Sequence, residues 1–483
     1  MRLYSEGSYE REPNVAFVNH GDDQGDDFRT EFRKDYGRLL HSSCFRRLQG
    51  KTQLFPGLES DFFRNRLTHS LEVAQIAKGL AIHLNATYSE LNGSQNQIDY
   101  DLVELAALAH DLGHPPFGHN GEAELHSIMF DNSGYEGNAQ TLRILSTLEK
   151  RYLNTAQVQN AINSTGTDLR RGLNLTYRSL ASILKYDDEI PTSSNRDEPL
   201  KGYYSYDKAL VKRIKEKVTG KKSYTPKFKT LECYLMDVAD DIAYSTYDFE
   251  DSLKAGFLHI LDIFSPQKQI IDLVAKKVKK NVAKVGINKN YEAKDVLLIY
   301  FNCLKNVLNQ DELFEAKLPN EDNPFILQAG QVYDNLKKLG DDGYFRTNLT
   351  SKLVHRFING IKLDYNKAMP ALSKVYLDQR VREEVEVLKN LVFVSQIESP
   401  KLKVSSYRGR EIVNKIYTAI HDTPNGSELL PEDFRRMYNL LPKSHKYRRR
   451  IVVDFIAGMT DRYAIEFYGR LTSENPQTIF KPL

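Results

Sequence analysis

The sequence contains few cysteines and no long run of apolar residues, and both absences narrow its class. Only Cys44, Cys233 and Cys303 occur in 483 residues, so there is neither a disulfide framework nor a paired-cysteine zinc pattern. No apolar run approaches the ~18 residues that a membrane-spanning helix needs. The N-terminal residues also lack the apolar core of a signal peptide. We therefore expect a cytoplasmic protein with no membrane partner.

The chain also lacks a strong excess of either charge. It has 67 basic and 64 acidic residues and a net charge of +3, whereas nucleic-acid-binding domains usually carry a clear basic excess. Two local basic runs, 276–280 and 445–450, favour a nucleic-acid-responsive protein. Such runs more often form a solvated helix face.

Helical spacing of apolar residues recurs along most of the chain. After His69 it predicts an amphipathic helix on Val73, Ile76, Ala77, Leu80 and Leu84. A second helix is expected to begin at an Asp101 N-cap, with Glu104 completing a capping box, and to end at His110. Because alternating strand patterns are scarce, we predict an all-α fold.

Other segments are less regular. A third helix is expected over about 228–250, and 296–301 fits either a short strand or a buried helix. The polar stretch 86–99 and the mixed stretch 187–226 are predicted to be loops, the second long enough to suggest a function. The lysine-rich segment 264–350 is predicted to form a helical insertion.

Histidines gather directly after the second helix. Four of the 12 lie between positions 110 and 126, in a block that begins His110-Asp111 and continues through His114, His119 and Glu122. Imidazole and carboxylate groups that share a helix end form a common ligand set for a divalent metal. The alternative is that His110 only caps the helix C-terminus, where a positive charge is favoured. The density of the block favours the metal site.

Two further ligands are expected from distant helices. His69 follows Arg64 and Arg66, and guanidinium groups beside a metal ligand suit a phosphate-bearing substrate. Alternatively, Thr68 or Ser70 caps the helix and His69 is incidental.

The remaining ligand should be a carboxylate from the helix over 228–250. Asp240 and Asp241 interrupt an apolar stretch, which either a metal or solvent exposure would explain, whereas Asp237 is assigned to solvent. Asp240, Tyr244 and Asp248 recur at every fourth position and share one helix face.

Taken together, these motifs resemble the HD superfamily of metal-dependent phosphohydrolases, and more closely the deoxyguanosine triphosphate triphosphohydrolases (dGTPases). The resemblance covers about 27–260 and 448–470 and is weak over 264–440. It is carried by the spacing of the histidines and aspartates and by the blocks 45–56, 64–70, 110–122, 136–140, 175–186, 237–251 and 456–464.

The resemblance implies hydrolysis of dGTP to deoxyguanosine and inorganic triphosphate, with a role in control of the dNTP pool. Alternatives are another HD-type nucleotide phosphohydrolase and a nucleic-acid-responsive regulatory HD protein. One divalent ion is implied, Mg²⁺ or Mn²⁺ first, with Fe²⁺, Co²⁺ or Zn²⁺ compatible. A homo-oligomer, hexamer or tetramer, and a single-stranded DNA or nucleotide effector are further implied partners.

The resemblance also assigns roles to single residues. The implied metal ligands are His69, His110, Asp111 and Asp240, with Asp241 as the fallback. The implied catalytic residues are His119, Glu122 and His114. The implied substrate contacts are Arg66, Lys185 and Tyr186 for phosphates, Tyr244 and Asp248 for sugar, and Gln53 for the base. Some relatives carry a catalytic histidine where this chain has Gly137, so His119 and Glu122 form the simpler catalytic pair.

The expected organisation has three parts. Residues 1–260 would form an HD-domain helical core, with the metal site in 64–126 and 231–251 and a loop excursion at 187–226. Residues 261–440 would form a helical insertion, and 441–483 a C-terminal helical segment that packs on the core.

Overall fold

The computed structural model divides the chain into two compact units. The first comprises Met1–Met236, Asp364–Lys374 and Val404–Leu483, and the second comprises Asp237–Leu363 and Val375–Lys403. The three-part division at 260 and 440 stays a prediction. The structure describes all residues except 1, 14–15, 18–27, 54–63, 94–95, 154–160, 164, 194–198, 256–257, 259–267, 308–341, 398–399 and 473–483.

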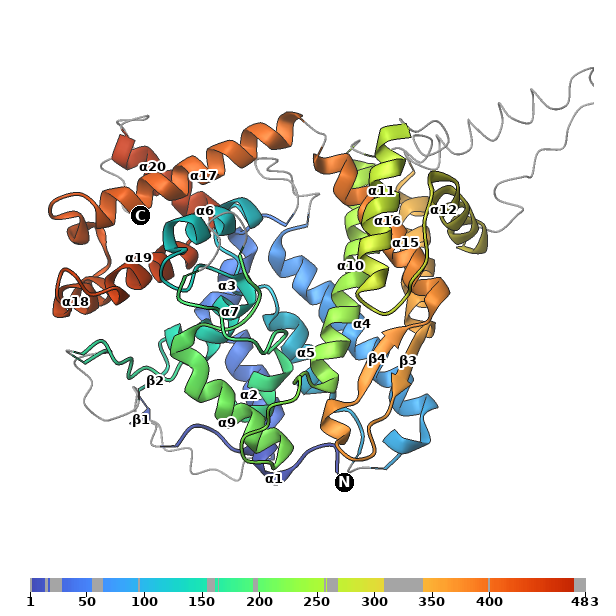
Figure 1. Ribbon diagram of the computed structural model, residues 1–483, viewed down its shortest axis with the longest axis horizontal. Helices are drawn as coiled ribbons and strands as arrows, with labels where there is room; N and C mark the ends of the chain where they lie inside the picture. Colours follow the sequence, from blue (N-terminus) through green and yellow to red (C-terminus); the bar gives the residue numbers. More distant parts are fainter. Residues whose placement is uncertain are drawn as a thin grey trace, which may run out of the picture. The chain divides into compact units, whose positions relative to one another are not determined.

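The centre of the first unit is a layer of helices around α4 (Arg66–Thr87) and α5 (Tyr100–Ala109) (Figure 1). These two helices pack on each other, and α5 also contacts α2 (Glu31–Leu40) and α8 (Tyr177–Ser182). All five apolar positions expected after His69 are buried in α4. Periodicity predicted this helix because its apolar residues face the neighbours that bury them.

The start of α5 differs from the expectation. Asp99 is the N-cap, and its Oδ1 accepts a hydrogen bond from the Leu102 amide at 3.0 Å. Asp101 lies in the first turn instead and pairs with Arg33 at 2.8 Å. Two acidic residues two positions apart both suit a helix N-terminus, one as a cap and one next to the positive end of the helix dipole. The prediction that Asp101 caps the helix was therefore wrong, while the end of the helix before His110 is confirmed.

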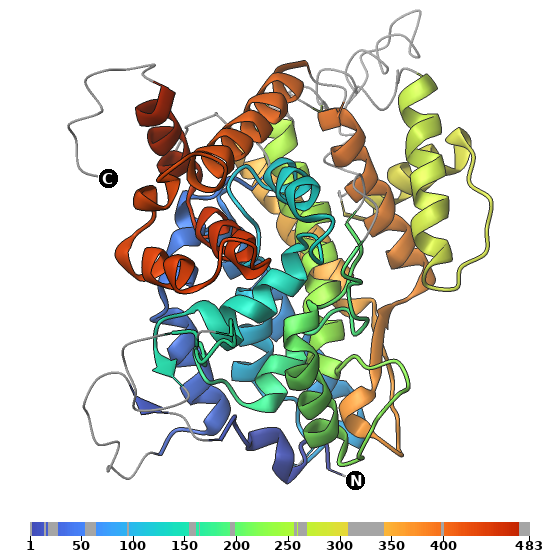
Figure 2. The same cartoon turned by 60° about the vertical axis from the view of Figure 1, so that its left-hand side comes forward.

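The C-terminal helices of the first unit lie beside α6 (His119–Met129) (Figure 2). Helix α19 (Tyr447–Ala457) contacts α6 directly. Residues of α6 such as Leu125 and Met129 share one buried apolar cluster with residues of α17 (Pro400–His421), α18 (Glu432–Leu440), α19 and α20 (Asp461–Thr472). This cluster fixes the helix that carries His119.

The rest of the first unit consists of short elements. They are α1 (Glu6–Tyr9), α3 (Ser43–Arg47), α7 (Gly137–Arg143), α9 (Lys208–Thr219), the 3₁₀ helices Leu48–Gly50, Ser89–Leu91, Ser205–Asp207, Pro370–Leu372 and Gly426–Leu429, and the π-helical turn Ile144–Leu148. Strands β1 (Ala16–Phe17) and β2 (Tyr152–Leu153) form an antiparallel pair in which Ala16 lies opposite Leu153.

The second unit is built on α10 (Leu231–Lys254), whose first six residues belong to the first unit. Helix α11 (Lys268–Ala283) packs on α12 (Ala293–Val307) and α16 (Gln379–Ile397), and α12 also contacts α15 (Gly343–Asn359). Strands β3 (Ile361–Asp364) and β4 (Lys374–Leu377) form a second two-stranded sheet. The all-α prediction is confirmed, since the sheets found among the described residues have two strands each.

Two segments expected to be loops contain helix. Helix α4 continues to Thr87, and α9 occupies the middle of the stretch 187–226. Helix α9 was missed because its narrow buried stripe of Val211, Ile214 and Val218 is set among lysines and arginine. The segment 264–350 contains α11, α12 and the first half of α15, with a turn and coil at 284–292 between α11 and α12. Residues 296–301 lie within α12, and 308–341 lie outside the described residues. No described helix has the length and apolar character that crossing a membrane requires.

Candidate active site

The first turn of α4 presents two of the expected site residues. Asn65 caps the helix, since its side chain accepts the Thr68 amide at 3.0 Å while its own amide donates to Thr68 Oγ1 at 3.0 Å. This reciprocal capping box fixes the helix start. Arg66 and His69 lie in the turn that follows, and both are buried. Because Asn65 is the cap, His69 is not a by-product of capping by Thr68 or Ser70.

His110 follows the last residue of α5 and turns its imidazole toward His69. The two ring centroids lie 5.5 Å apart, and a nitrogen of each lies within 4.8 Å of the other. His110 Nδ1 hydrogen-bonds the Ala107 carbonyl at 2.6 Å. Since a carbonyl only accepts, this bond places the proton on Nδ1 and the lone pair on Nε2. That tautomer is the one that a metal ligand needs.

Asp111 lies between cationic and imidazole groups. Its Oδ2 accepts from Arg66 at 2.6 Å, and its Oδ1 lies 3.1 Å from His114 Nδ1 and 3.3 Å from His110 Nε2. Burial alone would raise the pKa of Asp111, but its imidazole neighbours His110 and His114 and the guanidinium of Arg66 outweigh burial and hold the pKa well below its usual value. The group is therefore a carboxylate and can serve as an anionic ligand.

A tight turn separates Asp111 from α6. A Cβ at Gly113 would lie 1.9 Å from the Gly137 carbonyl oxygen, so only glycine fits there. Phe117 has φ of 64°, which is unfavourable for a bulky residue. The Asp461 carboxylate accepts the Phe117 amide at 2.9 Å and helps to hold this conformation. Strained backbone that its surroundings hold in place is typical of functional loops.

His119 and Glu122 form a hydrogen-bonded pair at the start of α6. His119 Nδ1 lies 2.9 Å from Glu122 Oε2, and the other carboxylate oxygen accepts the Gly137 amide at 2.8 Å. The side chain of His119 is 81% exposed, whereas that of Glu122 is 7% exposed. The His114 ring centroid is 5.3 Å from that of His119, so all three predicted catalytic residues lie together.

Electrostatics keep Glu122 ionised. Burial alone would raise its pKa, but the hydrogen bond to His119 and the charges of His114 and Lys201 lower it to about 2. Burial, helped by the Arg66 charge, also lowers the pKa of His114. The cluster therefore pairs a fixed carboxylate with an imidazole that reaches solvent.

Gly137 lies at the edge of this cluster. A Cβ added there would be 3.3 Å from Glu122 Oε1 and 3.8 Å from His114 Cε1. A histidine at this position would therefore begin beside the predicted catalytic group. In this chain the position contributes its backbone amide to Glu122 instead.

Comparison with known proteins agrees with this geometry. Residues 66–186 match the HD domain, and residues 375–470 match the phosphohydrolase-associated domain. The chain is 42% identical over the full length of both chains to deoxyguanosinetriphosphate triphosphohydrolase-like protein 2 of Mesorhizobium japonicum. It is 31% identical to a deoxyguanosinetriphosphate triphosphohydrolase-like protein of Aliivibrio salmonicida and 30% identical to one of Shewanella loihica, each over 92% of this chain and 93% of the relative.

The chain belongs to the deoxyguanosinetriphosphate triphosphohydrolase-like family. It is thus an HD-domain hydrolase, and HD domains bind divalent metals. In this member of the family, the predicted phosphate contact Arg66 is bonded to Asp111, so it orients a predicted metal ligand as well.

The predicted site residues of α10 lie in the second unit. Asp248 is fully buried, and burial together with the charges of Asp248 and Asp240 raises the pKa of Tyr244 well above its usual value. Asp241 is bound by two cations of α16, Arg382 at 2.7 Å and Lys389 at 2.5 Å. These pairs occupy the fallback ligand Asp241 and favour the choice of Asp240.

The remaining predicted contacts are spread over the first unit. Gln53 Oε1 is buried and accepts no hydrogen bond from the described residues, so it can accept one from a ligand. Lys185 and Tyr186 follow α8, and the Tyr186 ring centroid lies 5.9 Å from the ammonium of Lys201. Lys201 also pairs with Glu136 at 3.2 Å, next to Gly137.

Two supporting residues were not predicted. Lys51 is buried and donates to the carbonyls of His114 and Ala457, the second at 2.9 Å. Burial lowers the pKa of Lys51 to about 7. Asp461 accepts the amides of Phe117 and Thr52 at 2.9 Å each. The only sequence signal for Asp461 was its place in the block 456–464 shared with dGTPases.

Proposed function

We propose that this protein hydrolyses dGTP in preference to other dNTPs, releases deoxynucleoside and inorganic triphosphate, and thereby contributes to control of the dNTP pool in the cytoplasm. The observation that supports this proposal most is the pairing of exposed His119 with buried Glu122 at 2.9 Å, next to His114 and Asp111. It supplies a proton-transfer group beside candidate metal ligands, which is the combination that phosphate-ester hydrolysis needs.

The proposed metal ligands are His69, His110, Asp111 and Asp240. The donor chemistry fits a divalent ion, because His110 carries its lone pair on Nε2, faces His69, and adjoins an ionised Asp111. Mg²⁺ or Mn²⁺ is the expected ion. When bound, such an ion would neutralise phosphate charge and polarise a phosphoryl oxygen.

The chain's own groups would do the remaining work. Arg66, Lys185 and Tyr186 are proposed to hold the phosphates, since guanidinium and ammonium groups bind phosphate oxygens through charge-assisted hydrogen bonds. Cleavage at the α-phosphorus requires the 5′-oxygen to leave. His119 either donates a proton to that oxygen or accepts one from the attacking water, and Glu122 holds the ring by its Nδ1. Such acid–base help is worth about 10²–10⁴-fold in rate.

Selection of deoxyribose is assigned to α10. A tyrosine ring of Tyr244 against C2′ would leave no room for a 2′-hydroxyl, and the Asp248 carboxylate would accept the 3′-hydroxyl. A site built to bond one hydroxyl strongly rejects an analogue that lacks it. Gln53, whose Oε1 is a buried acceptor, would contact the base.

A product assay tests the proposal. Purified protein is incubated with each dNTP and with GTP, and triphosphate is separated from pyrophosphate and orthophosphate. We expect triphosphate with dGTP as the best substrate, and a loss of about 10²–10⁴-fold in His119→Ala. Orthophosphate or pyrophosphate as the product would instead support another HD nucleotide phosphohydrolase.

Assembly and effectors can be measured in parallel. Family resemblance leads us to propose a hexamer or tetramer, which light scattering would detect as a multiple of the 55.5 kDa chain mass. A salt-dependent activity change on addition of single-stranded DNA would favour the nucleic-acid-responsive alternative, because phosphate contacts weaken steeply with salt.

A further inference from the structure

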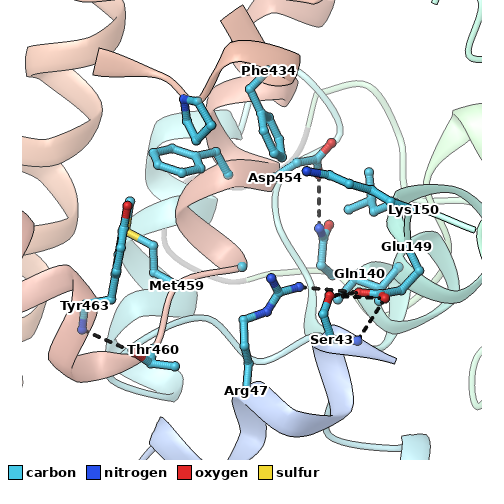
Figure 3. A pocket seen from close by; sticks show the side chains of 15 residues that line it. Ser43, Arg47, Gln140, Glu149, Lys150, Phe434, Asp454, Met459, Thr460 and Tyr463 are labelled. Atoms are coloured by element: carbon cyan, nitrogen blue, oxygen red, sulfur yellow. Dashed lines mark hydrogen bonds and ion pairs between the residues drawn. The ribbon is translucent and has the colours of Figure 1, made fainter. Parts of the chain in front are cut away.

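A cavity lies in the first unit, among the helices that support the turn 112–118 before His119, which we call the catalytic turn. We call the cavity the α19–α20 cavity (Figure 3). Its volume is about 460 Å³, within the range of small-molecule sites. Its lining comes from α3, α7, the π-helical turn, the start of α18, and the ends of α19 and α20 that face each other. None of its lining residues belongs to the predicted catalytic or metal-binding set.

The walls of this cavity are mainly apolar and aromatic. The apolar and aromatic lining residues are Ile144, Leu148, Pro431, Phe434, Phe455, Met459 and Tyr463. The rings of Phe434 and Phe455 have centroids 5.5 Å apart. Met459 and Tyr463 add a thioether and a phenol ring to the lining (Figure 3). Aromatic and thioether walls favour a flat ring system as the occupant.

The side-chain amide of Gln140, which lines the cavity, has an oxygen that lacks a hydrogen-bond donor among the described residues. Gln140 is fully buried, and its Nε2 donates to Asp454 Oδ1 at 3.0 Å. Because a carboxylate only accepts, this bond fixes which way the amide points. Gln140 Oε1 is then a buried acceptor with no donor among the described residues. Buried acceptors are rarely left unmet, so a ligand N–H at this point would complete the site.

Two cations lie at the rim. The side chain of Arg47 is 44% exposed and lies 3.4 Å from Glu149, and that of Lys150 is 68% exposed and pairs with Asp433 at 2.6 Å. The Lys150–Asp433 pair is exposed on both sides and contributes little, so Lys150 can turn to a polar ligand group, whereas Arg47 is paired with the buried Glu149. The Lys150 ammonium also lies 5.6 Å from the Phe434 ring centroid.

We propose that the α19–α20 cavity binds a purine nucleoside. The ring would lie between the aromatic walls, an N–H of its edge would donate to Gln140 Oε1, and sugar hydroxyls would face the rim cations. The choice of a nucleoside rests on the proposed function, because the proposed reaction releases a purine nucleoside. The α19–α20 cavity would thus bind the nucleoside product at a place separate from the proposed catalytic residues.

The contacts around the cavity connect it to the catalytic turn. Gly458, Met459 and Thr460 line the cavity and form the turn between α19 and α20. The residues on either side of this turn support the turn before His119: the Ala457 carbonyl accepts from Lys51, which also bonds the His114 carbonyl, and Asp461 accepts the Phe117 amide.

A bound nucleoside therefore acts on the backbone that supports the catalytic turn. A ligand wedged against residues 458–460 shifts the two anchors at 457 and 461. We expect bound deoxyguanosine to lower kcat for dGTP at unchanged KM, which is distinct from competition at the catalytic site.

Tryptophan fluorescence offers a direct test, because the sequence contains no tryptophan. Phe434→Trp places a single reporter in the cavity wall. We expect saturable quenching on titration with 2′-deoxyguanosine. The matched reporter Tyr344→Trp replaces a residue of the second unit that is 91% exposed, and it should show only the non-saturable loss caused by ligand absorbance.

The role of Gln140 is tested by changing the ligand and by changing the residue. Purine 2′-deoxyriboside has the same bicycle with no N–H on its edge and should bind about tenfold more weakly, the scale of one lost hydrogen bond. Gln140→Met in the Phe434→Trp background should remove this difference between the two ligands. If the variant does not fold, the comparison of the two ligands on the reporter protein still decides.

Each result bears on one proposal. Absence of saturable quenching in folded Phe434→Trp would overturn the cavity proposal even if dGTP is hydrolysed. Saturable quenching without dGTP hydrolysis would leave the cavity site standing and overturn the proposed function. Quenching with a raised KM and unchanged kcat would contradict the connection through residues 457–461.

Discussion

His119 Nδ1 lies 2.9 Å from Glu122 Oε2, and it is the carboxylate, not the imidazole, that is buried. The same carboxylate accepts the Gly137 amide, so it is held from two sides. His119, the proposed proton-transfer group, can therefore contact a substrate while the buried Glu122 carboxylate sets the orientation of its ring. Several expected outcomes depend on this arrangement.

The first concerns the charge of Glu122. Glu122→Gln keeps the size of the side chain but removes the charge that faces His119, so we expect kcat for dGTP to fall about 10–100-fold, the usual effect of removing a supporting partner. Triphosphate release measures this loss. Glu124→Gln, on the same helix, is the control and should remain within about twofold of wild type. Equal activities in the two variants would contradict an orienting role for Glu122.

The second concerns stability against pH. The folded-state pKa of Glu122, about 2, lies below its usual 4.5, so its stabilising contribution is present above pH 4.5 and is lost as pH falls toward 2. The shift corresponds to roughly 3 kcal/mol at neutral pH. Urea unfolding should show a larger free-energy gap between wild type and Glu122→Gln at pH 6 than at pH 3. A gap that does not change with pH would contradict the lowered pKa.

The third concerns the anchor of the catalytic turn. Asp461→Ala removes the acceptor of the Phe117 and Thr52 amides, and we expect it to lower the free energy of unfolding by about 1–3 kcal/mol. Because Phe117 has φ of 64° and loses a support, kcat should fall while bound metal stays unchanged. Denaturant unfolding, turnover and metal content separate these effects. Loss of stability with full kcat would show that the turn does not depend on this anchor.

The fourth concerns the sugar. If Asp248 accepts the 3′-hydroxyl, wild-type kcat/KM for dideoxy-GTP should lie about 10⁴-fold below that for dGTP. Asp248→Ala should reduce this ratio mainly by weakening use of dGTP. Equal hydrolysis of GTP and dGTP by wild type would contradict the assignment of Tyr244 to C2′.

The fifth concerns the metal. Chelation should abolish activity, and Mn²⁺ or Mg²⁺ should restore it. Metal at 100 times its dissociation constant should also raise the free energy of unfolding by about 2.7 kcal/mol. In His110→Ala this increment should be absent, whereas His83→Ala, within α4 but outside the predicted site, should retain it. An unchanged increment in His110→Ala would remove His110 from the ligand set.

The sequence predicted those parts of the molecule whose signals are local. Helix α4 and its buried positions followed from periodicity, and the group of His114, His119 and Glu122 followed from its closeness in the chain. Asp99 was missed as a cap because Asp101 offers the same chemistry two residues later.

The contacts that hold the catalytic turn were beyond such reasoning. Lys51 and Ala457 are 406 positions apart, and neither residue type in its own segment indicates the other. Helix α9 was missed for a related reason. Its few apolar positions can be recognised as a buried face only when the surface that they pack against is known. Contacts between residues far apart in the chain cannot be predicted from the periodicity of a single sequence.

The bond between Lys51 and Ala457 has a consequence for biosynthesis. A ribosome adds about 5–20 residues per second, so roughly 20–80 s pass between synthesis of the lysine and synthesis of its acceptor. Throughout that interval the nascent chain carries the lysine without its acceptor, and α6, once made, lacks the apolar cover of α17, α19 and α20 until those helices follow. The histidines of the predicted site are therefore synthesised early, whereas the residues that hold their turn in place are synthesised late. A nascent chain stalled before residue 457 would be a substrate for chaperones rather than an active enzyme.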